Sequence, residues 1–127
     1  MTGTKSFTRI AANTAGGSNF HDDEIPLDTS LAITGLPSML TGTIPAASAA
    51  VYVRHDTSGG ARQPAPHNAP RRQWVVMLRG IIEVEVTDGS RRTFGPGDLI
   101  RAEDTDGTGH VTRLVGDPPW EALYLPG

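Results

Sequence analysis

Residues that interrupt regular secondary structure recur along the whole chain, and they limit the folds that it can adopt. The 127 residues include 15 glycines and 10 prolines, and patterns typical of helices are nearly absent. Glycine and proline at this density suit short strands joined by tight turns. The sequence therefore predicts an all-β protein.

The second half of the chain carries the clearest strand patterns. In IIEVEV (residues 81–86), aliphatic and glutamate side chains alternate, so one face of this strand is expected to be buried and the other solvated. Similar short stretches, separated by turn signals, occur at residues 50–55, 73–79, 91–94, 99–104, 110–115 and 120–126. About eight strands with turns at intervals of about 8–12 residues indicate a sandwich or a barrel.

The length of the chain favours one domain, because a single core organises about 100–150 residues. We expect residues 1–19, rich in Ser, Thr, Gly and Asn, to form a flexible tail, and residues 20–127 to form the domain. A short strand is expected at residues 24–27, at a sheet edge because it contains Pro26. Residues 31–50 are small, apolar and interrupted by glycine and proline, and we expect them to wrap around the core.

Composition excludes several classes of function. The absence of cysteine rules out disulfides, thiolate metal sites and cysteine nucleophiles. The net charge of −3 provides no electrostatic basis for nucleic-acid binding. No apolar run approaches the ~20 residues that cross a bilayer, and the first residues contain no secretory signal. We therefore expect a soluble, cytoplasmic protein that binds neither nucleic acid nor membranes.

Two stretches carry a family resemblance: HNAPRRQ at residues 67–73 and AEDTDGTGH at residues 102–110. Together with Gly80 and with the turn at Pro96 and Gly97, they resemble the motifs of small single-domain bacterial cupins. The resemblance implies a single cupin jelly-roll β-barrel, with open strand edges that also favour a homodimer. It does not imply one reaction, because this fold is shared by enzymes, binding modules and sensors.

The same resemblance indicates where the site should lie. Gln73 opens one expected strand and His110 opens another, and strand alternation would place Val75 and Met77 on the same face as Gln73. His67, in the loop before Gln73, could reach the same pocket. A small-molecule site is typically such an apolar pocket with a few convergent polar groups.

A metal site of the usual cupin type would be incomplete in this chain. The family motif has a second histidine and a glutamate where this sequence has Ala69 and Gln73. Two imidazoles and an amide, from His67, His110 and Gln73, lack the carboxylate that strengthens binding of a divalent cation. His55 or Asp104 could supply a further ligand. We expect no cofactor, and a divalent transition metal is the alternative.

Acid–base chemistry fits these residues better than metal chemistry. Histidines in a half-dry pocket can move protons at neutral pH, so His67 and His110 are the candidate catalytic pair. The candidate substrate-binding residues could donate hydrogen bonds to a carbonyl or enolate oxygen, pair with a carboxylate, or line the pocket. They are Tyr52, Arg54, Asn68, Arg72, Gln73, Met77 and Asp104. Tyr52 and Arg54 share one face of their strand and His55 lies on the other, so only one of these sets can point inward.

Three functions remain open on this basis. The first is a metal-independent lyase, isomerase or cyclase acting on a small carbonyl-bearing metabolite. The second is a metal-dependent, oxygenase-like cupin using His67, Gln73 and His110, and the third is a non-catalytic module that binds a small molecule. Each residue also has a purely structural interpretation: His67 and Gln73 could satisfy backbone groups, and Asp104 could stabilise its own turn.

Overall fold

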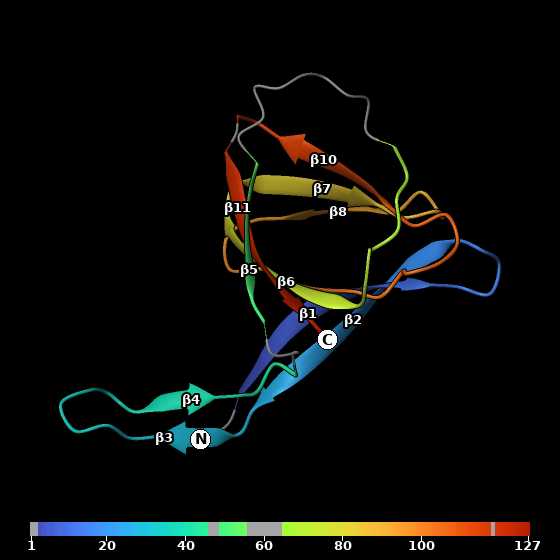
Figure 1. Cartoon of the computed structure of the whole chain (residues 1–127). Coiled ribbons are helices and arrows are strands. Elements are labelled where there is room, and N and C mark those ends of the chain that lie inside the picture. The colour runs from blue at the N-terminus through green and yellow to red at the C-terminus, as the bar shows by residue number, and fades with distance from the viewer. Residues whose placement is uncertain (1–2, 46–48, 56–64, 118) are drawn as a thin grey trace.

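The computed structural model describes residues 3–45, 49–55, 65–117 and 119–127, and these residues form an all-β fold (Figure 1). The prediction of an all-β protein is confirmed. The strands are β1 (Gly3–Ala12), β2 (Ser18–Leu27), β3 (Thr29–Leu31), β4 (Met39–Thr41), β5 (Val51–His55), β6 (Gln73–Arg79), β7 (Ile81–Glu85), β8 (Arg91–Phe94), β9 (Leu99–Ala102), β10 (Val111–Val115) and β11 (Trp120–Pro126). No helix in this part of the chain is long and apolar enough to cross a membrane.

Two sheets form the body of the molecule. The larger has six strands in the order β2-β1-β9-β6-β11-β5, and the smaller has three in the order β10-β7-β8. One core lies between them, because buried side chains of both sheets form a single cluster that includes Ile10, Val75 and Ala122 from the large sheet and Ile82, Val84 and Phe94 from the small one. The sheets pack as a jelly-roll-like sandwich, one of the two architectures that the strand pattern predicted, and do not close into the barrel that the family resemblance implied.

The alternation in the sequence explains the small sheet. In β7, Ile82 and Val84 are buried against the large sheet, whereas Glu83 and Glu85 lie on the outer face and pair with arginines of β8 and β10. Strand β6 is different, because its first three residues are all buried. It lies between β9 and β11, and its outer face is covered by a second cluster around Trp74.

The N-terminal segment is a strand, so the prediction of a flexible tail over residues 1–19 is wrong for residues 3–12. Strand β1 pairs with β2 along its whole length and runs parallel to β9 from Thr8 to Ile10. Ile10 is 2% exposed and belongs to the main core. The composition suggested a tail because this segment has few apolar residues. In the structure, those few residues pack on both faces of the large sheet.

Strand β2 contains the expected residues 24–27 and lies at an edge of the large sheet, as predicted from Pro26. Its exposed residues 21–24 include three carboxylates in sequence. Charged side chains and proline on an edge strand discourage pairing with another chain. The open edge of β2 is therefore protected against pairing.

Strands β3 and β4 form a hairpin that projects from the body, and we call residues 29–41 the arm (Figure 1). The prediction that residues 31–50 wrap around the core is wrong for residues 31–41, and residues 46–48 lie outside the described residues. Four large apolar side chains of the arm are exposed: Leu31, Ile33, Leu36 and Met39. Only the following residues return to the body, where Ile44 packs on the second cluster and the indole of Trp74 donates a hydrogen bond to the carbonyl of Pro45 at 2.6 Å.

Candidate functional site

A cavity of about 170 Å³ lies between the two sheets. Strand alternation directs side chains of both sheets into it, and most of its walls are apolar. The lining residues are Ile10, His67, Ala69, Pro70, Gln73, Val75, Ile82, Val84, Ile100, Ala102, His110, Thr112, Trp120 and Tyr124. His67, Gln73 and His110 are therefore brought together in one cavity.

A short backbone bridge joins the two histidines. The backbone N–H of His67 donates to the carbonyl of His110, and the N–H of His110 donates to the carbonyl of His67, both at 2.9 Å. The centres of the two imidazole rings are 4.6 Å apart. His110 is 8% exposed, whereas His67 is exposed at the mouth of the cavity. The bridge therefore places one sheltered and one accessible imidazole side by side.

Gly109 allows this close approach. Its φ of +79° lies in the left-handed region, and a Cβ at this position would lie 2.0 Å from the carbonyl oxygen of His67. The loop is further held by Ser18, whose hydroxyl donates to the carbonyl of Gly109 at 2.6 Å. A side chain at position 109 would force the two loops apart.

Asp104 lies directly behind His110. Its side chain is fully buried, and its Oδ2 is 2.5 Å from Nδ1 of the His110 ring. A carboxylate at Nδ1 accepts the proton of that nitrogen, which leaves Nε2 of the ring as the proton acceptor. The other oxygen, Oδ1, has no hydrogen-bond partner among the described residues. Asp104, expected to bind substrate or a metal, instead orients His110.

Gln73 lies at the start of β6, opposite Ala102 of β9, and is 4% exposed. Its Oε1 is buried without a partner among the described residues. Its acceptor oxygen is therefore not engaged by a backbone N–H of the described residues. Met77, expected on the same wall, is 1% exposed and packs in the core away from the cavity lining.

Four other predicted substrate-binding residues lie outside the cavity. Tyr52 and Arg54 share the outer face of β5, where Arg54 pairs with Glu121 at 3.6 Å and Tyr52 is 57% exposed. The hydrogen bond with Glu121 raises the pKa of Tyr52, further from neutral pH. His55 lies on the opposite face of β5, where its exposed ring stacks on Trp120 with the ring centres 4.7 Å apart, and it does not line the cavity.

Asn68 and Arg72 have structural partners instead of facing the cavity. The Asn68 amide donates to the carbonyls of Asp104 and Gly107 at 3.3 and 2.9 Å, and so ties its loop to the loop before His110. Arg72 is bonded to Glu103 on the outer face of the large sheet. Both residues lie in the segment before β6, but their side chains contact a neighbouring loop and the outer face of the large sheet and do not line the cavity.

Trp120 and Tyr124 belong to the site but were not predicted as part of it. Both lie on the inner face of β11, and Trp120 Nε1 is buried without a partner among the described residues. Burial raises the pKa of Tyr124, so its hydroxyl stays protonated beyond the usual range of tyrosine. The alternation in WEALYLP could have revealed this face, because it groups Trp120, Ala122 and Tyr124.

Glu103 is the centre of a charge cluster on the outer face of the large sheet. Its carboxylate pairs with Arg9 at 3.3 Å, with Arg101 at 3.5 Å, and closely with Arg72. Burial opposes ionisation, but the hydrogen bonds and charges of these arginines outweigh it and hold the pKa of Glu103 below its ordinary value. The cluster joins β1, β9 and the loop before β6.

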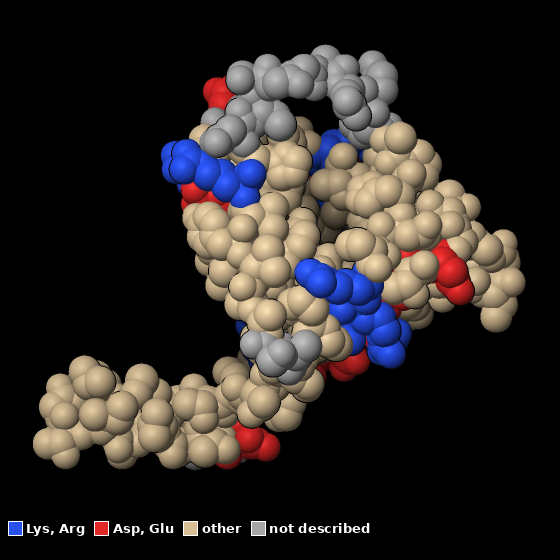
Figure 2. Space-filling model, in the orientation of Figure 1, with Lys and Arg blue, Asp and Glu red and all other residues tan. Residues whose placement is uncertain are grey.

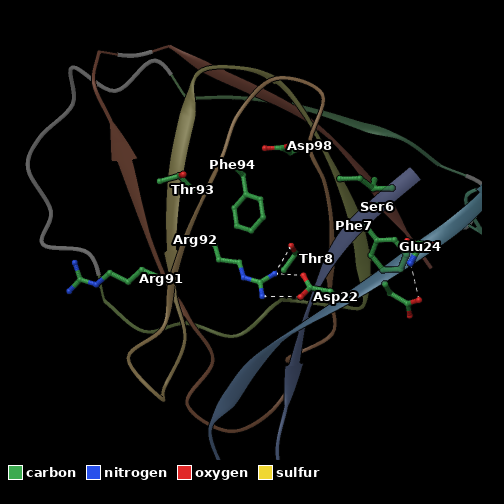
Figure 3. Close-up of a pocket in the computed structure, with 12 residues that line it drawn as sticks. Ser6, Phe7, Thr8, Asp22, Glu24, Arg91, Arg92, Thr93, Phe94 and Asp98 are labelled. Carbon is green, nitrogen blue, oxygen red and sulfur yellow. Dashed lines mark hydrogen bonds and ion pairs between the residues drawn. The ribbon is translucent and has the colours of Figure 1, made fainter. Parts of the chain in front are cut away.

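A larger and more open hollow, of about 880 Å³, lies between β8 and the pair β1–β2 (Figure 3). In Figure 3, Arg92 points into it and bonds Asp22 at 2.6 Å and Thr8 at 3.1 Å, while Arg91 points away. Asp98 accepts a hydrogen bond from the backbone N–H of Gly95 at 2.8 Å. These polar groups are paired with one another, so the hollow offers less reactive chemistry than the cavity between the sheets.

The cavity fits a divalent metal poorly. No group of three or more histidine, cysteine, aspartate or glutamate side chains with metal-binding geometry occurs within residues 3–45, 49–55, 65–117 and 119–127. The fully buried carboxylate nearest the histidines, that of Asp104, is engaged with Nδ1 of His110. Ala69, in the cavity wall, has no ligating atom. His67, His110 and Gln73 remain, and they supply no negative charge.

No protein-family model matches the chain, and no curated protein is significantly similar to it.

Proposed function

We propose that this protein is a small-molecule enzyme of the cupin type that moves protons on a carbonyl-bearing compound without a metal, as an isomerase, lyase or cyclase. The observation that carries the proposal is the pairing of His110 with fully buried Asp104 at 2.5 Å, beside a mostly apolar cavity. A histidine held in one tautomer by a buried carboxylate is a common arrangement for a general base.

The roles follow from the hydrogen bonds. With Nδ1–H donated to Asp104, Nε2 of His110 removes a proton from the carbon next to the carbonyl group, and the electron pair of that C–H bond moves toward the carbonyl oxygen. Asp104 stabilises the imidazolium that forms. The amide of Gln73 donates a hydrogen bond to the enolate oxygen. The proton returns at another atom from His67 or His110, which completes an isomerisation, or it leaves with a departing hydroxyl group, which completes an elimination.

The proposal is tested by the exchange of α-protons of small ketones in D₂O, followed by ¹H NMR. The wild-type protein should accelerate the exchange above the buffer rate, and His110→Ala should reduce the acceleration by about 10²–10⁴-fold. His21→Ala serves as the matched control, because His21 is exposed on β2 and does not line the cavity. If His110→Ala retains the wild-type rate, the mechanism is wrong. Binding of ketones without exchange would instead support a non-catalytic binding module.

Asp104 is a positioning residue in this scheme, and its role has a separate readout. Asp104→Asn keeps the shape of the side chain but removes the charge, so His110 should lose its fixed tautomer and ketone exchange should slow by about 10²-fold or more. In ¹⁵N-detected NMR, the shifts of the two ring nitrogens of His110 should change in Asp104→Asn. Unchanged nitrogen shifts in a folded variant would contradict the assigned role.

We also propose that the homodimer expected from the sequence forms through the arm. The arm exposes Leu31, Ile33, Leu36 and Met39, and residues 29–45 carry no charged side chain. In Figure 2 it extends from the body as an almost uniformly uncharged surface. A two-fold contact needs a surface that complements itself, and an uncharged apolar hairpin meets this condition better than the acidic edge of β2 does.

A further inference from the structure

The walls of the cavity limit the chemistry of its ligand. Its apolar walls come from both sheets, through Val75 and Ile100 on one side and Ile82 and Val84 on the other. The strand register places Gln73 and Ala102 at one end of the cavity, whereas Trp120 lies beside the opposite end of β6. The histidines lie at the Gln73 end, because they occupy the two loops that lead into β6 and β10.

The described residues of the cavity wall include no side chain that is permanently cationic and could neutralise an anionic ligand. Among the described residues, no lysine or arginine lines it. Arg54 and Arg72, which the sequence suggested as carboxylate-binding residues, lie on outer faces with Glu121 and Glu103. The carboxylate of Asp104 is committed to His110. Moving a carboxylate or phosphate from water into such a space without a partner is strongly unfavourable.

The volume limits how much of a ligand the cavity can bury. Pockets for drug-sized ligands are about 300–1,000 Å³. At about 170 Å³ this cavity is well below that range. An apolar cavity of about 150 Å³ in another protein accommodates benzene, so the space here suits one six-membered ring with a small substituent.

Unpaired polar atoms indicate which groups the ligand carries. Gln73 Oε1 and Trp120 Nε1 are buried without partners among the described residues, and both side chains line the cavity. A buried polar group without a partner destabilises the fold by about 1–3 kcal/mol. The N–H of Trp120 can donate to a ligand carbonyl oxygen, whereas Oε1 of Gln73 accepts a hydrogen bond and can be satisfied only by a ligand hydroxyl. An uncharged ligand with one or two oxygens is therefore a better complement than a pure hydrocarbon.

We propose that the substrate class of this cavity is an uncharged, single-ring or equally compact carbonyl compound, and that anionic carbonyl compounds are excluded. The proposal rests on the function proposed above, because it concerns the same cavity, but it is tested by binding rather than by turnover. The two can therefore fail separately.

The test compares three ligands by isothermal titration calorimetry at pH 8, where an ordinary imidazole is neutral. Acetophenone and benzoate are nearly equal in size and differ in charge, and 2-acetonaphthone is uncharged but larger. Acetophenone should bind with a Kd at least about tenfold lower than that of either other compound. Equal or tighter binding of benzoate, equal binding of 2-acetonaphthone, or no binding of acetophenone at millimolar concentration would each overturn the proposal.

A substitution locates the binding. Ala102 lines the cavity and is 5% exposed, so Ala102→Leu should fill part of the space and weaken acetophenone binding at least about tenfold. Ala15→Leu, on an exposed loop, is the matched control and should bind like the wild type. If Ala102→Leu does not fold, competition of acetophenone with a paramagnetic broadening probe at the His110 resonances gives the same information. Acetophenone binding that leaves the His110 resonances unperturbed contradicts the assignment to this cavity.

If acetophenone binds as expected but no ketone undergoes α-proton exchange, the catalytic function fails and the ligand class stands. If exchange is catalysed but benzoate binds better than acetophenone, the catalytic function stands and the proposed ligand class fails.

Discussion

At the scale of single residues, the site depends on the lack of a side chain at Gly109 as well as on the two histidines. His67 and His110 approach one another because Gly109 lets two backbone segments come within hydrogen-bonding distance. The sequence indicated the two histidines and Gln73 through their motif, but it gave no sign that Asp104 would lie behind His110. That contact depends on how the loop of residues 103–109 folds back, which strand periodicity does not describe.

Gly109→Ala should therefore damage stability and site geometry together. Gly89→Ala is a matched control, because Gly89 also has a left-handed φ, +88°, but no atom within 4 Å of the added Cβ. The control should cost about 1–2 kcal/mol from the backbone alone. Gly109→Ala should cost at least about 1 kcal/mol more, because His67 must shift, and it should also slow ketone exchange. Urea unfolding and the exchange assay check both effects, and equal losses in the two variants would contradict this account of Gly109.

At the scale of elements, the sequence patterns placed several strands correctly. The strands at residues 51–55, 73–79, 81–85 and 120–126 lie where the pattern placed them. The patterns did not predict β1, which has many polar side chains but pairs with a strand on each side. They also failed for the arm, whose apolar side chains suggested burial but are exposed. In both cases composition was a poor guide, because what a segment packs against is decided by distant parts of the chain.

The arm is an element whose role can be separated from that of the body. Replacing Leu31, Ile33 and Leu36 together with serine should raise the dimer dissociation constant at least about tenfold, since each buried leucine or isoleucine contributes about 1.5–3 kcal/mol. The far-ultraviolet circular dichroism of the body should stay the same. Leu78→Ser is the control, because Leu78 is also an exposed apolar residue but lies on β6. Sedimentation equilibrium measures the effect, and a dimer that persists in the arm variant would place the interface elsewhere.

At the scale of the whole molecule, Glu103 links parts of the fold that are distant in the sequence. Its pKa is lowered in the folded protein from an ordinary value of 4.5. A group with a lowered pKa stabilises the folded state above its ordinary pKa, and this stabilisation is lost as the pH falls through the folded pKa. The cluster could not be predicted from sequence, because Arg9, Arg72 and Glu103 meet only after β1 pairs with β9.

Glu103→Gln should accordingly lower the free energy of unfolding by about 1–3 kcal/mol at pH 7, because hydrogen bonds to a charged acceptor are lost. The difference from the wild type should shrink as the pH falls below 4.5. Glu24→Gln, at an exposed position of β2, controls for the loss of a surface charge. Urea unfolding at a series of pH values measures the difference, and a difference independent of pH would show that the charge of Glu103 is not its cause.

The bridge between His67 and His110 also has a consequence for how the site comes into existence. Its two residues are far apart in the sequence, and Ser18, which holds the same loop, is more distant still. Contacts of this kind form late and together during folding, because the chain must first close long loops. We therefore expect the site to form only in the folded chain, and the proposed ligand to bind only that form. By thermodynamic linkage, every molecule of ligand bound stabilises the entire fold, so the melting temperature becomes a report of site occupancy.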